Sequence, residues 1–115
     1  LIVIKDAFIE TCTVGNRICL EMNRSRLLKF ARRMGWVQCD GALFRSSAEI
    51  DLLFIKRTTG ASGSGLKVFT FFDFVTFLME DVGNLLCPDT APMSLARLTC
   101  IVSMIRAAPA PTGSP

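Results

Sequence analysis

The stretch Cys39-Asp40-Gly41 places a thiol beside a carboxylate, a combination that could serve nucleophilic catalysis or zinc binding. A thiol nucleophile needs a neighbouring base, and zinc needs three further ligands from other segments. The chain contains no histidine, which removes the Ser-His and Cys-His pairs and the commonest zinc ligand. We therefore interpret the stretch as an Asp-Gly turn with a small buried thiol, and we predict that the chain is not an enzyme.

Calcium binding is the second chemistry to consider, because carboxylates close two candidate loops. A loop of the EF-hand type presents oxygen ligands at positions that include 1, 3, 5 and 12. With Asp73 as the last loop residue, the earlier positions fall on Ser62, Ser64 and Leu66. With Glu49 as the last, they fall on Gln38, Asp40 and Ala42, and Leu43 stands where glycine is expected. One or two carboxylates cannot offset the dehydration of a divalent ion, so we expect no metal and no cofactor.

The glycine-rich stretch 60–67 could be compared with a phosphate-binding loop. It does not fit that motif, because Lys67 follows Leu66 instead of a glycine and no helix begins directly after it. The glycines and serines of residues 58–65 instead predict a flexible loop.

A basic cluster offers binding chemistry in place of catalysis. Five basic residues lie within ten positions that hold no acid: Arg24, Arg26, Lys29, Arg32 and Arg33. Such a cluster is either a solvated helix face or an electrostatic footprint for an acidic partner surface. Phe72 and Phe77 widen the apolar face of a later helix, and exposed phenylalanines suit an interface. The five basic residues and these two phenylalanines are our candidate partner contacts.

Composition also indicates a protein partner. Half of the 115 residues are hydrophobic and the mean hydropathy is +0.44, yet no apolar run reaches the roughly 18 residues of a membrane helix. The net charge of +3 is too small to predict nucleic-acid binding. The five cysteines show no CxxC spacing, which favours reduced thiols in the cytosol. We expect a protein partner, no nucleic acid and no membrane.

The order of helix signals predicts an all-α fold of four or five short helices. The expected helices are residues 1–10, 23–34 (N-capped by Asn23 and ended by Gly35), 46–57 (with a Ser46/Glu49 capping box), 70–82 (capped by Thr70 and Asp73) and 93–106. The expected connections are loops at 11–19 and 58–65 and an extended piece at 67–69. We divide the chain into a core domain (1–83), a linker (84–92) with Pro88 and Pro92, a helix (93–107) and a Pro/Ala tail (108–115).

Apolar spacing predicts which faces are buried. The expected core positions are Leu27, Phe30, Ala31 and Met34 in the second helix, Ile50, Leu53 and Phe54 in the third, and Leu95, Leu98, Val102 and Ile105 in the last. Arg26, Lys29 and Arg33 are expected on the opposite side of the second helix. Two helix–loop–helix units sharing the third helix predict a degenerate EF-hand-like bundle. We expect a minimal two-stranded pairing between its loops near Phe44 and Val68.

Taken in order, these segments resemble the core domain of the tubulin-polymerisation-promoting protein (TPPP) family over about residues 7–81. The resemblance is carried by Ala7-Phe8, Gly15, Glu21-Met22, Asp40-Gly41, Glu49 to Phe54 and Phe69 to Phe74. It implies a non-enzymatic, microtubule-binding protein of the cytosol, often associated with cilia and flagella. Zinc, which has been linked to that family, is not expected here because the chain has no histidine. The family's glycine-rich, basic C-terminal segment is replaced by an apolar helix.

The sequence therefore leads to two functional hypotheses. The first is a structural microtubule-associated protein that binds tubulin and is a component of the ciliary or flagellar axoneme. One specific form of this hypothesis places it on the lumenal wall of the doublet beside other axonemal proteins. The alternative is an EF-hand-like adaptor that binds a partner helix without contacting tubulin.

Overall fold

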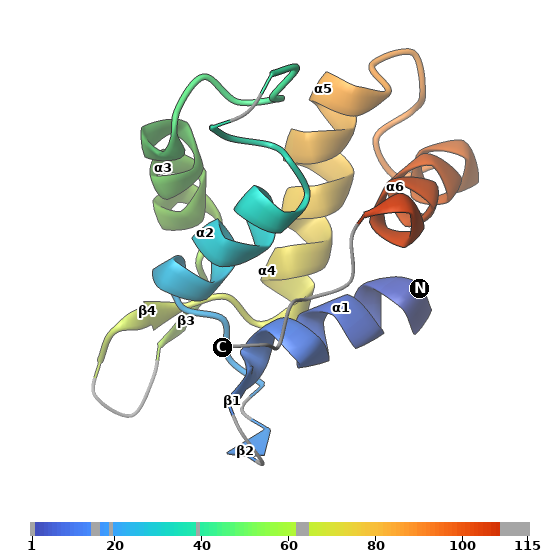
Figure 1. The fold of residues 1–115 in the computed structure, drawn as a ribbon. Helices are drawn as coiled ribbons and strands as arrows, with labels where there is room; N and C mark the ends of the chain where they lie inside the picture. The colour runs from blue at the N-terminus through green and yellow to red at the C-terminus, as the bar shows by residue number, and fades with distance from the viewer. Residues whose placement is uncertain (1, 15–16, 19, 39, 62–64, 109–115) are drawn as a thin grey trace.

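The computed structural model describes residues 2–14, 17–18, 20–38, 40–61 and 65–108 (Figure 1). Several sequence predictions concern residues outside these ranges, namely those for Gly15, Cys39, Ser62, Ser64 and the tail beyond Ala108.

Helices make up most of the described chain, which confirms the all-α prediction. The helical elements are α1 (Ile2–Cys12), α2 (Arg24–Arg33), α3 (Ser47–Arg57), α4 (Phe71–Thr76), the π-helical segment η1 (Phe77–Val82), α5 (Gly83–Leu86) and α6 (Leu95–Ala107). Two short antiparallel ladders accompany them: β1 (Thr13–Val14) with β2 (Arg17–Ile18), and β3 (Gly60–Ala61) with β4 (Lys67–Val68). The predicted 11–19 loop is thus shorter than expected, because α1 extends to Cys12 and a ladder follows.

One continuous helical column, α4–η1–α5, runs through the middle of the molecule (Figure 1). The helices α2 and α3 lie on one side of this column and α6 lies on the other, while α1 crosses its base. Contacts of α1 with α2, α4 and α6, and of η1 with α3 and α6, join these parts. The column is therefore the element against which the others pack.

Helix α2 begins and ends where its sequence predicts. The side chain of Asn23 accepts a hydrogen bond from the Arg26 amide at 2.9 Å, which satisfies one of the free amides of the first turn. Gly35 follows the helix with φ +75°, a left-handed conformation that glycine adopts without strain. Leu27, Phe30 and Ala31 are buried and Met34 is partly buried, as predicted.

The two predicted capping boxes have different outcomes. In α4, Thr70 Oγ1 accepts from the Asp73 amide, and Asp73 Oδ2 accepts from the Thr70 amide at 3.0 Å. In α3 the prediction is wrong: Ser46 makes no side-chain cap, and Glu49 Oε1 accepts from the Arg45 amide at 2.7 Å. The Glu49 carboxylate thus reaches one residue further back than a capping box requires.

The predicted pairing of Phe44 with Val68 is also wrong. Val68 pairs with Gly60 inside its own loop. The bridge between loops joins Met22 to Phe69, with N–H···O distances of 3.0 and 2.7 Å. Both residues directly precede an N-cap, so they hold equivalent positions before α2 and α4. Phe44 instead donates its amide to the Trp36 carbonyl at 2.9 Å.

The fourth helix does not end before Gly83 as predicted. It continues through η1 and α5 to Leu86, so the first three residues of the predicted linker are helical.

The column carries the aromatic core: Phe74 packs on Phe8 and Phe30, and Phe77 packs on Trp36 at 6.2 Å between ring centroids. Phe77 is fully buried, which removes it from the candidate partner contacts. Its position is explained by core packing alone.

Helix α6 begins at Leu95, two residues after the predicted start at Met93. Its N-cap is Ser94, whose Oγ accepts from the Arg97 amide at 3.1 Å. Leu98, Val102 and Ile105 pack against the core and Ile101 is fully buried. Leu95 is 77% exposed, which corrects its place in the predicted apolar face. The buried face is centred on Ile101, and Leu95 lies outside it because six residues are not a whole number of helical turns.

Gly83 marks the closest approach of α5 to α6. A Cβ atom at this position would lie 2.5 Å from Arg97 Cδ, and Arg97 is held in place by its own hydrogen bonds. We predict that Gly83→Ala destabilises the fold by about 1–2 kcal/mol, because overpacking outweighs the better helix propensity of alanine. Urea unfolding of the variant measures this difference.

A second background tests whether contact with Arg97 causes the predicted loss of stability in Gly83→Ala. In an Arg97→Ala background the clash is absent, so adding Gly83→Ala is expected to stabilise by up to about 1 kcal/mol. If Gly83→Ala stabilises the otherwise unchanged protein, close packing against Arg97 is not what limits this position.

Candidate interaction surface

The basic residues of α2 divide into two groups according to their angle around the helix. Successive residues of an α-helix are rotated by about 100° around the helix axis. The buried stripe of α2 is centred between Leu27 and Phe30. Lys29 and Arg32 lie opposite this stripe and are exposed. The other three basic residues flank the stripe and reach neighbouring helices. The expected set of Arg26, Lys29 and Arg33 on the side opposite the stripe therefore holds only for Lys29.

The side facing α1 holds two of these arginines. Arg26 Nη1 donates to the Thr11 carbonyl at 3.1 Å. Arg33 pairs with Glu10 at 3.6 Å, its guanidinium lies 5.3 Å from the Phe30 ring centroid, and its side chain is only 18% exposed. The predicted projection of Arg26 and Arg33 into solvent is therefore corrected: both fasten α2 to the end of α1.

Arg24 flanks the other edge of the stripe and faces α3. Its guanidinium lies 3.7 Å from Asp51 Oδ2, and its side chain remains 62% exposed. An exposed pair at this distance contributes at most about 1 kcal/mol. Arg24 can therefore exchange Asp51 for another carboxylate at little cost, and it belongs with Lys29 and Arg32 in what we call the basic face (Arg24, Lys29 and Arg32).

Phe72 lies at the same end of the molecule as the start of the basic face. The Met22–Phe69 bridge holds the N-termini of α2 and α4 side by side, and Arg24 and Phe72 each follow this bridge within a few residues. Phe72 is 72% exposed, and Leu20, just before the bridge, is 61% exposed. The bridge thus joins the two chain segments that carry Leu20, Arg24 and Phe72. Sequence analysis named Phe72 but missed Leu20.

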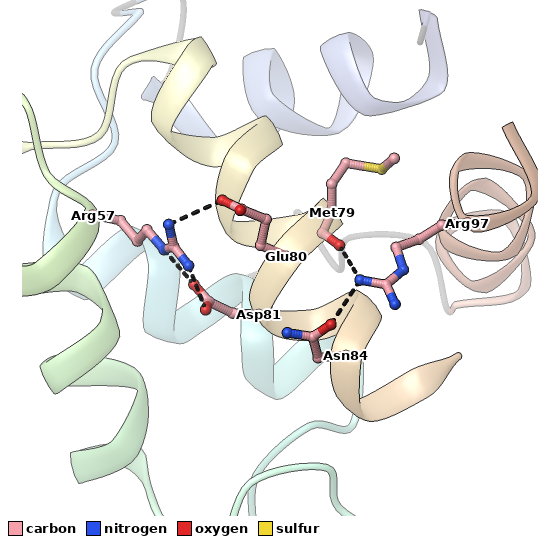
Figure 2. A network of polar contacts seen from close by, with 6 residues as sticks. All are labelled: Arg57, Met79, Glu80, Asp81, Asn84 and Arg97. Carbon is pink, nitrogen blue, oxygen red and sulfur yellow. Dashed lines mark hydrogen bonds and ion pairs between the residues drawn. The ribbon is translucent and has the colours of Figure 1, made fainter. Parts of the chain in front are cut away.

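Two arginines that sequence analysis did not single out organise the column. Figure 2 shows Arg57 and Arg97 approaching it from opposite sides. Arg57, at the end of α3, bonds Asp81 through two nitrogens at 2.9 and 3.0 Å and Glu80 at 3.0 Å. The hydrogen bond with Asp81, opposed by partial burial, raises the pKa of Arg57 above its ordinary value. The guanidinium therefore remains charged and ties α3 to η1.

Arg97 enters from α6 and is only 1% exposed. All five of its N–H groups are used. The acceptors are the Met79 carbonyl, Asn84 Oδ1, the Cys87 carbonyl, the Thr90 carbonyl and Thr90 Oγ1, at 2.7–3.2 Å. Figure 2 shows the bonds to Met79 and Asn84. Every acceptor is an uncharged oxygen, so Arg97 is a structural cation that joins η1, α5 and the following turn to α6.

The donor set does not fit a calcium ion. Both oxygens of Asp73 are already committed: Oδ2 accepts from the amides of Thr59 and Thr70, and Oδ1 accepts from the Thr59 hydroxyl at 2.8 Å. The described residues include no cluster of three or more histidine, cysteine, aspartate or glutamate side chains. Asp73 therefore acts as a cap and a loop anchor.

Comparisons with protein-family models, curated proteins and solved structures find no match to this chain. None of the described helices is long and apolar enough to cross a membrane. Function is therefore inferred from the basic face, from the exposed side chains beside the bridge, and from the sequence resemblance.

Proposed function

We propose that this chain is a non-enzymatic structural protein that binds tubulin through the basic face of α2. The observation that carries the proposal is that Lys29 and Arg32 are exposed on one side of α2 with no acidic partner among the described residues. Tubulin surfaces are acidic, and a set of solvent-exposed charges gives both attraction and salt dependence. Phe72 and Leu20 would add apolar contact at the end of this face.

The arrangement of helices supports the family resemblance behind this proposal. We infer that α1–α2 and α3–α4 are two EF-hand-like units whose loops are coupled by the Met22–Phe69 bridge. This differs from the expected division, in which the two units share α3. In both units an apolar bridge residue is followed by an N-cap, Asn23 or Thr70. Arg26 then stands at the place that Asp73 occupies in the second unit, so the first loop has a cation where a ligand carboxylate would be needed.

Charge reversal on α2 is the test. We predict that Lys29→Glu/Arg32→Glu weakens binding to microtubules by about tenfold at low salt, since each exposed charge contributes up to roughly 1 kcal/mol. Tubulin should be polymerised with the protein already present, because a lumenal site is hard to reach in a closed tube. The bound fraction is then measured by co-pelleting over a range of protein concentrations at two salt concentrations.

The matched control is Lys5→Glu/Arg106→Glu, which changes the net charge equally on α1 and α6. Both residues are exposed, so this variant should bind tubulin within about twofold of the parent if the site is local. Equal losses in the two variants would mean that only net charge matters. A folded parent that remains in the supernatant at both salt concentrations would refute the tubulin proposal.

The adaptor hypothesis is the second candidate, and a separate observation favours it. Leu52 and Ile55 lie three residues apart on α3 and are 68% and 53% exposed. Residues at this spacing share one helix face, so they form an apolar contact on α3, a different helix from the one that carries the basic face. Loss of partner binding in Leu52→Ser/Ile55→Ser, with charge reversal on α2 having no effect, would favour the adaptor.

A further inference from the structure

Two cysteines meet where α5 and α6 converge. Cys87 directly follows α5, Cys100 lies within α6, and the two thiols interact where these helices pack against each other. Both are half-buried, so a small oxidant can reach them. Cys12, by contrast, is the last residue of α1 and is fully buried in the core.

Arg97 holds the backbone on both sides of this pair. Its Nη2 donates to the Cys87 carbonyl at 3.2 Å, and the Thr90 hydroxyl donates to the same carbonyl at 2.7 Å. Cys100 lies three residues after Arg97 on α6, so the two share a helix face. The two thiols are therefore presented by segments that are fixed to the same guanidinium, and contact between them does not depend on a chance approach of two loops.

The surroundings act on the Cys100 thiol in opposing directions. Burial and the hydrogen bond with Cys87 raise the pKa of Cys100, while the positive charge of Arg97 acts in the opposite direction. The Arg97 contacts are all uncharged oxygens, so no neighbouring carboxylate among them neutralises this charge. A nearby cation stabilises the thiolate, which is the reactive form of cysteine.

We propose that Cys87 and Cys100 form a reversible intramolecular disulfide when the protein meets a peroxide. One thiolate attacks a peroxide oxygen, the O–O bond breaks, and a sulfenic acid and hydroxide result. The second thiolate then attacks the sulfenic sulfur, forming the S–S bond and releasing a second hydroxide. The two hydroxides take up the two thiol protons, so hydrogen peroxide is reduced to two waters while two thiols are oxidised. A dithiol reductant reverses the modification by exchange.

This disulfide would close the loop that contains Thr90 and Pro92 and would fasten α6 to the end of the column. A cross-link at this point constrains the unfolded chain and leaves the basic face untouched. The proposal is independent of tubulin binding.

The test uses the full chain carrying Cys19→Ser/Cys39→Ser, which leaves the three cysteines at described positions. After treatment with hydrogen peroxide under native conditions, we expect the loss of two hydrogens by intact mass and a peptide cross-link between Cys87 and Cys100. The Cys12 thiol should remain reduced. Dithiothreitol should restore the original mass.

Adding Cys87→Ser or Cys100→Ser to this background provides the matched controls. Each should fail to lose two hydrogens and should leave the other cysteine to accumulate as sulfenic or more highly oxidised forms. The proposal is overturned if the parent keeps all three thiols, forms only disulfide-linked dimers, or takes up oxygen at either cysteine without cross-linking.

Discussion

Replacing Arg97 with alanine is expected to destabilise the protein by about 3–5 kcal/mol, an effect large enough to threaten folding of a domain of this size. The substitution empties the space of a large buried side chain and leaves the Met79 and Thr90 carbonyls without their donor. Because Arg97 joins α6 to η1 and α5, the loss should also loosen the packing of α6. Urea unfolding, followed by the fluorescence of Trp36 and by circular dichroism, measures the change.

Two further substitutions separate the geometry of Arg97 from its charge. Arg97→Lys keeps the charge but has three donors in place of five, so it should show an intermediate loss of stability. Arg106→Ala removes an exposed arginine from the same helix and should change stability by less than about 0.5 kcal/mol. Full stability of Arg97→Ala would show that the five hydrogen bonds contribute nothing net to folding.

Asp73→Ala is the second substitution with a large expected effect, a loss of about 2–4 kcal/mol. Asp73 is 1% exposed and accepts from the amides of Thr59 and Thr70 at 3.1 and 3.0 Å, and from the Thr59 hydroxyl. Alanine would leave two part-buried amides without their acceptor and would remove the cap of α4. Urea unfolding of the variant, with hydrogen exchange at Thr59 and Thr70 as a local readout, tests this expectation.

The asparagine variant refines the Asp73 test. Asp73→Asn keeps one carbonyl oxygen for the two amides, and its NH₂ group can donate to the Thr59 hydroxyl. It should therefore lose only about 1 kcal/mol, and Asp89→Ala, at an exposed aspartate, should be nearly neutral. Equal losses in the alanine and asparagine variants would mean that charge at this position matters more than hydrogen bonding.

Local signals were sufficient to predict most helix boundaries. Asn23, Gly35 and the Thr70–Asp73 pair act through backbone groups only a few residues away, so their geometry can be read from spacing alone. Ser46 and Glu49 show the limit of this reasoning. Their spacing permits a capping box, but the carboxylate is also within reach of the Arg45 amide, and that bond forms instead.

Contacts between distant segments could not be predicted in the same way. Val68 and Phe44 are both apolar and both lie near loops, but strand pairing depends on how whole helices pack. A usable signal was nevertheless present, since Met22 and Phe69 each stand directly before an N-cap and pair with one another.

The basic face was predicted from composition and only partly from geometry. The angular positions of Arg26 and Arg33, next to the buried stripe, could have indicated contact with a neighbouring helix, although Glu10 and the Thr11 carbonyl could not have been named as partners. Arg97 lies four residues before the buried Ile101, on the inward side of α6. Its acceptors come from three segments and become visible only in the folded chain.

The Met22–Phe69 bridge has a consequence for how the chain can be divided. It joins Met22, in the loop of the α1–α2 pair, to Phe69, in the loop of the α3–α4 pair. Neither loop can therefore make all of its backbone hydrogen bonds without the other. Closing a long loop is unfavourable until the contacts beyond it form, so we expect the bridge to form late in folding. Fragments cut between α2 and α3 would each expose aromatic core on the severed side. We therefore expect the two helix pairs to fold as one unit and not as separable halves.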